Sequence, residues 1–164
     1  MLQLMTLLGE RHYKKEDIMD ILAERLKYLR EKHRLTQPEA GKIVDVQYKT
    51  YQKYEYGQAA PSISMLIEFA KYYKVSVGFL IGDCNEEISA RSYLQTDTFS
   101  NRLQQLRKNI GYYQKDVALQ MGIKPRSYQC YELGEHNPNI ETLCKLAAFY
   151  GVSVDYLVGL DVEK

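Results

Sequence analysis

The segment YQKYEYG at residues 51–57 recurs as YQCYELG at residues 128–134, an offset of 77 positions. The same offset places RLKYLR (residues 25–30) on RLQQLR (residues 102–107). Over residues 25–82 the register holds without a gap and gives about 20 identities in 58 positions. Self-similarity at a fixed offset is typical of a repeated structural unit. The sequence therefore predicts two copies of one domain.

The first half of each copy has a helical pattern. Apolar residues recur on one face over residues 17–33, and the counterpart helix is expected over residues 98–110. The second helix is predicted to start at Thr36, whose hydroxyl can cap the helix. Glu39, three residues later, can accept a hydrogen bond from the Thr36 backbone N–H, which would complete a capping box. Tyr113 replaces this capping residue in the second copy, so a weaker start is expected there.

The remaining helices are marked by turn residues. A third helix is predicted over residues 47–56 and 124–133, with a glycine directly after each as a breaker. Fourth helices follow Pro61 and Pro138, and short fifth helices begin at the two Val-Ser-Val sequences. The predicted fold class is all-α, with two tandem five-helix domains. The expected order is an apolar arm or extra helix (1–16), a first domain (17–82), an acidic linker (83–97), a second domain (98–160) and a tail (161–164).

Charge is distributed unevenly along the chain. The net charge is +1, but residues 22–82 carry +4 and residues 99–159 carry +2, whereas residues 83–98 carry −3. Local positive charge in both repeats is expected of a surface that contacts phosphates. The three cysteines form no C-x-x-C pair, and the three histidines have no partner at ligand spacing, so neither a metal nor a cofactor is expected. The N-terminal segment lacks the features of a signal peptide or a membrane span, and a cytoplasmic location is expected.

The ordered motifs of both copies resemble the Cro and phage-repressor (XRE-type) family of helix-turn-helix domains. In the first copy they are LTQPEAG (35–41), YEYG (54–57), PSI (61–63) and VSVGFL (75–80), and in the second QKDVA (114–118), YELG (131–134), PNIETL (138–143) and VSVDYL (152–157). Together the copies cover roughly three-quarters of the chain. The resemblance implies that the second helix braces across the DNA backbone while the third enters the major groove. Small residues, Gly41 and Ala118, would let these two helices pack closely, and Gly122 suits a positive-φ turn that Asp45 can partly tolerate.

The resemblance also implies the contact residues. Base-reading candidates are Gln47, Tyr48, Lys49, Thr50, Gln52 and Lys53 in the first copy, and Lys124, Pro125, Arg126, Ser127, Gln129 and Cys130 in the second. Phosphate-contacting candidates are Thr36, Gln37, Gln114 and Lys115. Arg126 is suited to two-pronged binding of guanine, and Gln47 or Gln52 to adenine. The partner is therefore expected to be double-stranded operator DNA, bound by a transcriptional regulator, and a homodimer is expected as for many relatives.

Other interpretations compete with DNA reading. The 15 tyrosines suggest stacking platforms for single strands, but the resemblance implies that Tyr51 and Tyr128 occupy core positions of the third helix. Glu55 and Glu132 suggest catalytic carboxylates, yet a helix-end charge or an arginine partner, Arg30 or Arg107, is the preferred explanation because no nucleophile–base pair accompanies them. The rival to the regulator is an antitoxin-like or protein-interaction module in which one repeat has lost DNA binding. An enzyme is not expected.

Overall fold

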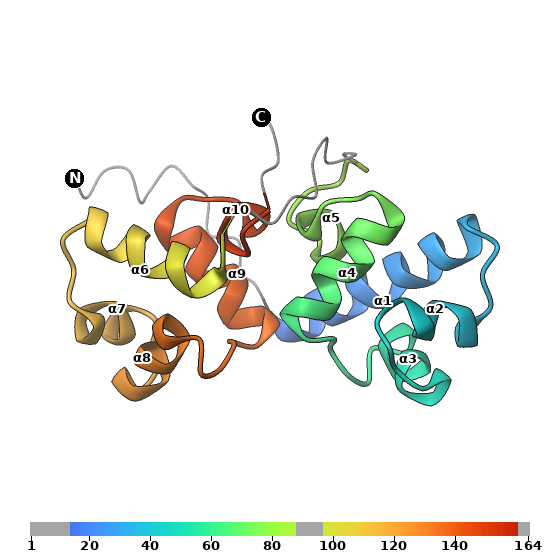
Figure 1. The fold of residues 1–164 in the computed structure, drawn as a ribbon, viewed down its shortest axis with the longest axis horizontal. Helices are drawn as coiled ribbons and strands as arrows, with labels where there is room; N and C mark the ends of the chain where they lie inside the picture. Colours follow the sequence, from blue (N-terminus) through green and yellow to red (C-terminus); the bar gives the residue numbers. More distant parts are fainter. Residues whose placement is uncertain (1–13, 88–96, 161–164) are drawn as a thin grey trace.

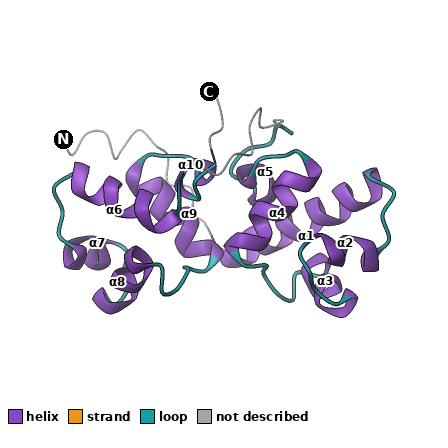
Figure 2. Ribbon diagram, in the orientation of Figure 1, coloured by secondary structure: helices purple, strands orange, loops and turns teal. Residues whose placement is uncertain are grey.

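The computed structural model describes residues 14–87 and 97–160, which form ten α-helices (Figure 1). In the first repeat these are α1 (Lys15–Lys32), α2 (Gln37–Ile43), α3 (Tyr48–Glu55), α4 (Ile63–Tyr73) and α5 (Val77–Ile81). In the second they are α6 (Phe99–Asn109), α7 (Gln114–Gln120), α8 (Pro125–Leu133), α9 (Ile140–Tyr150) and α10 (Val154–Leu157). The all-α class and the two five-helix repeats are confirmed (Figure 2). The segments 1–13, 88–96 and 161–164, which include the predicted apolar arm, most of the acidic linker and the tail, lie outside the described residues.

The predicted helix starts follow from local chemistry. The Thr36 hydroxyl accepts the Glu39 N–H at 3.4 Å, and the Glu39 carboxylate accepts the Thr36 N–H at 2.7 Å, which completes the expected capping box. In the second repeat the Asp116 carboxylate accepts the Tyr113 N–H at 3.0 Å. The tyrosine hydroxyl lies at the far end of its ring and cannot bond back to the nearby amides, so α7 is capped from one side only.

The turn between the second and third helices has the expected backbone conformation. Asp45 adopts φ of 54° and Gly122 adopts φ of 63°. Close approach of the two helices is also confirmed in the first repeat, because a Cβ atom on Gly41 would lie 2.8 Å from the Val46 carbonyl oxygen. The second repeat accommodates the extra methyl of the buried Ala118 at the matching position. The helix-turn-helix geometry is thus formed in both copies.

The two repeats pack against one another around the middle of the molecule. Figure 1 shows the first repeat on the right and the second on the left, with α4, α5, α9 and α10 at the centre. Contacts across the junction join α5 to α10 and α1 to α9. The buried apolar residues of the two repeats form one continuous cluster, which includes Phe69 and Leu80 of the first repeat and Leu143 and Leu157 of the second. This packing fixes how the two helix-turn-helix units face their surroundings.

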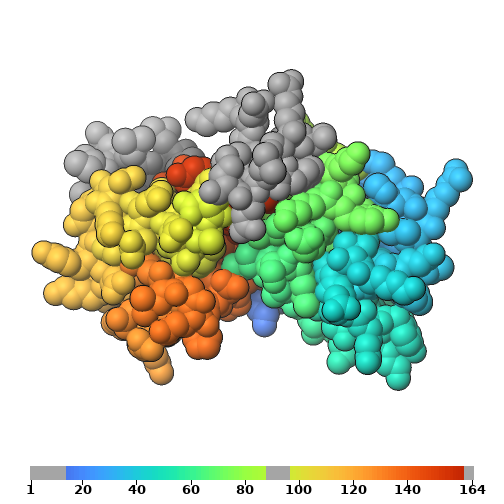
Figure 3. Space-filling view, viewed as in Figure 1, coloured from blue at the N-terminus to red at the C-terminus, as the bar shows by residue number. Residues whose placement is uncertain are grey.

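The helices α3 and α8 lie on the same side of the molecule, near its opposite ends (Figure 1). In the space-filling view both project from the lower edge, with a recess between them (Figure 3). The described helices include none with both the length and the apolar character that a membrane span requires.

Candidate nucleic-acid interface

A buried ionic cluster holds each third helix against the rest of its repeat. The Arg30 Nε donates to Glu55 Oε1 at 2.5 Å, and the Gln37 side-chain amide donates to Glu55 Oε2 at 2.9 Å. The second repeat reproduces both contacts, Arg107 to Glu132 at 2.5 Å and Gln114 to Glu132 at 2.8 Å. The predicted arginine partners of the two glutamates are confirmed. Each carboxylate therefore joins the first, second and third helices of its repeat.

The charge state of the second cluster follows from competing effects. Burial raises the pKa of Glu132, but hydrogen bonds from Arg107 and Gln114 outweigh it, so that the pKa lies below its ordinary value. Charge-assisted hydrogen bonds of this kind are stronger than neutral ones. The cluster is a structural device that orients α8, and the carboxylate is ionised at neutral pH.

The tyrosines of the third helices form the core below the exposed surface. Tyr51 and Tyr128 are fully buried, as predicted, and Tyr54 is 5% exposed. The Tyr51 hydroxyl donates to the Leu26 carbonyl oxygen at 3.5 Å, and the hydroxyls of Tyr128 and Tyr150 lie 2.7 Å apart. Burial raises the pKa of both Tyr51 and Tyr128, so these phenols remain neutral. The core role explains why tyrosine recurs at these positions.

The outer face of α3 carries most of the predicted base-reading residues of the first repeat. Gln47, Tyr48, Lys49 and Lys53 are exposed, whereas Thr50 and Gln52 are half-buried. Neither Lys49 nor Lys53 forms an ion pair with another described residue. The start of α3 therefore presents the Gln47 amide, the Tyr48 phenol and the Lys49 ammonium group, and Lys53 adds a second ammonium group one turn further along.

The outer face of α8 differs in its charge. Lys124, Pro125 and Arg126 are exposed, and Ser127 and Gln129 are half-buried. The Arg126 guanidinium donates to Gln129 at 2.9 Å and to Glu135 at 3.1 Å, so its charge is partly offset in the free protein.

Cys130 departs from the expectation that it reads bases. The residue is only 6% exposed, and interaction with the Glu135 carboxyl raises the pKa of its thiol. So small an exposed area disfavours direct contact of the thiol with a base edge in this conformation. Its sequence counterpart, Lys53, is exposed, and its longer side chain extends into solvent.

The phosphate-contacting candidates lie at the starts of α2 and α7. Thr36 and Lys115 are exposed, and Gln37 and Gln114 are half-buried. The side-chain amides of both glutamines are engaged by the buried glutamates. The groups left for a phosphate are the Lys115 ammonium group and the first backbone N–H groups of each helix, of which α2 has fewer because Pro38 has no N–H and the Glu39 N–H is bonded to the Thr36 hydroxyl.

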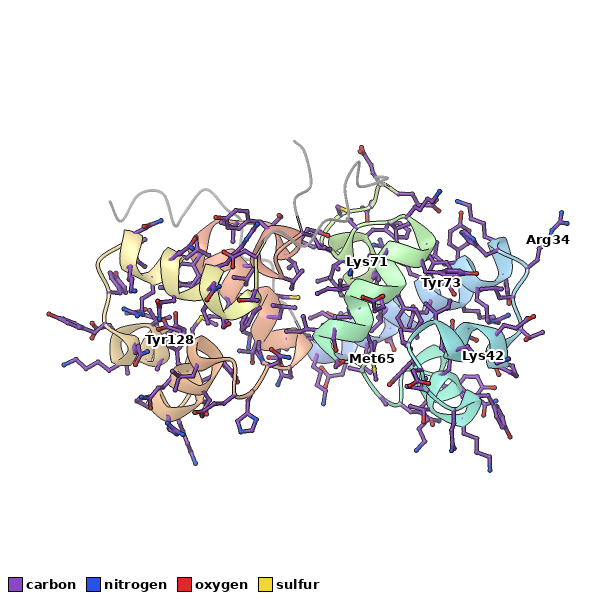
Figure 4. The ribbon with its side chains drawn as sticks, viewed as in Figure 1. Arg34, Lys42, Met65, Lys71, Tyr73 and Tyr128 are labelled. Atoms are coloured by element: carbon purple, nitrogen blue, oxygen red, sulfur yellow. The ribbon has the colours of Figure 1, made fainter. Side chains whose placement is uncertain are left out.

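The surface around the two helix-turn-helix units is not equivalent. Lys42 is exposed on α2 (Figure 4), and its counterpart on α7 is Leu119, which is 78% exposed. Lys42 was not among the residues expected from the sequence, although the basic-to-apolar difference at this matched position was a readable signal. At this matched position the first unit therefore presents an ammonium group and the second an apolar side chain. Within the described residues no cluster of three or more His, Cys, Asp or Glu side chains is arranged to hold a metal ion.

Comparison with known proteins agrees with this geometry. The helix-turn-helix family model matches residues 26–80 and again residues 103–157. The transcriptional regulator ImmR of Bacillus subtilis is 38% identical over 64 residues, which cover 39% of this chain and 50% of that protein. The cryptic phage CTXphi transcriptional repressor RstR of Vibrio cholerae is 40% identical over 60 residues, which cover 37% of this chain and 54% of the repressor.

A third relative, the SPbeta prophage-derived regulator YonR of Bacillus subtilis, is 40% identical over 60 residues, or 37% of this chain and 56% of that protein. The chain spans about half the length of the curated relatives that it matches. No solved structure gave a significant match. Because the family model matches two segments that together make up more than half of the sequence, the chain belongs to the helix-turn-helix family.

Proposed function

We propose that this protein is a sequence-specific regulator of transcription, of repressor type, that binds double-stranded operator DNA in the cytoplasm and is not an enzyme. The observation that carries the proposal is the placement of α3 and α8 on one side of the molecule, each with the first half of its outer face exposed. A duplex offers successive major grooves on one face about 34 Å apart. Two recognition helices on one side suit such a target.

The roles of individual residues follow from their exposure and chemistry. Lys49 and Lys53 on α3 are the first candidates for base contacts, joined by Gln47 and Tyr48. When DNA is bound, the Arg126 guanidinium on α8 would release the Glu135 carboxylate and donate its hydrogen bonds to the edge of a guanine. Lys115 and the unbonded backbone N–H groups at the starts of α2 and α7 would hold phosphates and fix the register without reading sequence.

Selection from a random duplex library at moderate salt tests this proposal. The full chain should enrich a defined sequence, and its affinity should fall steeply as salt rises because phosphate contacts release counterions. Lys71→Ala is a matched control for charge, because Lys71 lies on α4, away from the recognition helices, in a surface pair with Glu68. Enrichment of no sequence by the wild-type chain would contradict the regulator assignment.

A second candidate function has one observation in its favour. In the second repeat the exposed Leu119 of α7 replaces Lys42. After α8, Glu135 replaces Gln58 of the first repeat. A repeat with this surface suits a protein-interaction or antitoxin-like module that has lost DNA binding. Under this alternative, Arg126→Ala leaves the selected sequence and the affinity unchanged, whereas the regulator proposal expects loss of preference at half of the site.

The homodimer expected from the sequence is untested and is not part of this proposal. Since α5 and α10 already contact each other within one chain, a second chain would have to use another surface.

A further inference from the structure

The two repeats meet at the N-termini of their fifth helices, and the contact there is asymmetric. The Asp155 carboxylate of α10 accepts the Val77 N–H at 2.7 Å and the Gly78 N–H at 2.9 Å, both in the first turn of α5. Asp155 is only 4% exposed. The first amides of a helix have no partner within the helix, and a carboxylate there gains from the helix dipole. One side chain therefore caps a helix of the other repeat.

The sequence offset shows that this contact has no mirror image. Asp155 corresponds to Gly78, so the first repeat has no carboxylate at the matching position of its fifth helix. Gly78 is helical and does not need the freedom of glycine for its backbone. What it supplies is space, because a Cβ atom there would lie 3.0 Å from an Asp155 oxygen. The glycine and the aspartate fit each other as a pair.

We propose that the Asp155–Gly78 contact makes the two repeats of one chain prefer each other over the same repeat of a second chain, so that a single chain is the complete two-headed DNA-reading unit. Pairing of two second repeats would bring two buried Asp155 carboxylates together. Pairing of two first repeats would leave both α5 N-termini without a carboxylate. Only the pairing of a first repeat with a second repeat gives the Asp155 carboxylate and the α5 N-terminus a partner. Interfaces gain specificity when the alternative pairings leave such groups unpaired.

A second asymmetric element supports the same pairing. The helix α1 begins at Lys15, seven residues before Leu22, the position that corresponds to the first residue of α6. This extension contains the buried residues Ile18 and Met19, and α1 contacts α9 across the junction. The first repeat thus contributes a helical segment to the junction that α6 lacks.

The consequence for DNA, which rests on the proposed function, is an operator with two different half-sites bound by one chain. Because α3 and α8 present different residues, the two halves are not read alike. The expected stoichiometry is one chain per duplex, and the expected operator is not a palindrome.

A reciprocal exchange tests the contact. Gly78→Asp alone places two carboxylates at the junction, and we expect the unfolding midpoint to fall by roughly 5 °C or more and the radius of gyration in X-ray scattering to rise. Adding Asp155→Gly transfers the aspartate to the other repeat, where it faces the α10 N-terminus, and should restore most of both values. Gly78→Asp combined with Asp155→Asn is the matched control, because Asn brings an amide N–H toward amide donors and should not restore them.

The mass of the free chain and of its complex completes the test. Light scattering at micromolar concentration should give the 19.1 kDa of one chain, and a duplex selected by the wild-type chain should bind one chain. Failure of the exchange to restore docking, or a doubled mass with or without DNA, would overturn the inference while leaving DNA selection intact. Absence of any selected duplex would instead count against the proposed function.

Discussion

The Arg30 guanidinium and the Glu55 carboxylate join α1 to the recognition helix α3 through two nearly parallel hydrogen bonds, Nε to Oε1 at 2.5 Å and Nη2 to Oε2 at 3.2 Å. The Glu55 side chain is 2% exposed and that of Arg30 is 13% exposed. Arg107 and Glu132 repeat the arrangement in the second repeat. The position of each recognition helix therefore depends on one buried ion pair.

Glu55→Ala should destabilise the chain by about 3 kcal/mol, because it leaves the Arg30 charge and the Gln37 amide without their acceptor. Urea denaturation followed by circular dichroism measures the change. Glu68→Ala is the control, since Glu68 forms an exposed pair with Lys71 and should cost less than about 1 kcal/mol. Equal losses in the two variants would show that burial of the Glu55 pair contributes nothing.

Glu132 should make the second repeat sensitive to acid. Its folded-state pKa is lowered, so the stability that it contributes is present above its ordinary value and is lost as the pH falls toward the folded value. Glu132→Gln should thus be less stable than wild type near neutral pH, with a difference that narrows below about pH 4.5. Asp155 has a raised pKa and acts in the opposite sense, but it is common to both proteins and cancels in the comparison. A difference that does not vary with pH would contradict this account.

Lys74→Gly should stabilise the first repeat. Lys74 ends α4 with φ of 56°, whereas the corresponding Gly151 reaches φ of 65° without a Cβ penalty. Relief of that penalty exceeds the extra chain entropy of glycine, for a gain of about 0.5 kcal/mol. Gly151→Ala serves as the converse and should lose about 1 kcal/mol. Thermal unfolding of both variants checks the signs, and a loss of stability in Lys74→Gly would refute the strain argument.

Lys49→Ala with Lys53→Ala should lower the preference for the selected operator over a scrambled duplex about tenfold or more, because base contacts carry the discrimination. Gln37→Ala should weaken binding to both duplexes more evenly, since this residue supports the brace rather than the reading face. Fluorescence anisotropy with the two duplexes at one salt concentration gives both ratios. If the double variant keeps the wild-type ratio of affinities for the selected and scrambled duplexes, the two lysines of α3 do not read the sequence.

Local chemistry in the sequence predicted much of the fold. The Thr36–Glu39 capping box, the left-handed turn at Asp45 and Gly122, and the arginine partners of the two glutamates all depend on residues close in sequence or repeated in register. The left-handed turn and the arginine–glutamate pair occur in both repeats because each repeat packs its first three helices in the same way, whereas the full capping box occurs only in the first. The exposed faces of α3 and α8 followed from the same register.

The residue pairs that join the two repeats were not predicted, because they lie more than 70 positions apart and no local pattern encodes them. The signal in the sequence is the difference between Gly78 and Asp155 directly after the matched Val-Ser-Val sequences. Burial of Cys130 was missed for a related reason. The Cys130 thiol interacts with Glu135, a residue of the loop after α8 whose position the helical pattern does not define.

Hydroxyl-radical footprinting of the full chain on its selected duplex tests the central claim most directly. Two recognition helices on one side of a single chain should protect two patches on one face of the DNA, about one helical turn apart, with different base contacts in each. Arg126→Ala should weaken only one patch, and Lys49→Ala only the other. A single protected patch, or two identical patches that respond equally to both substitutions, would contradict the account.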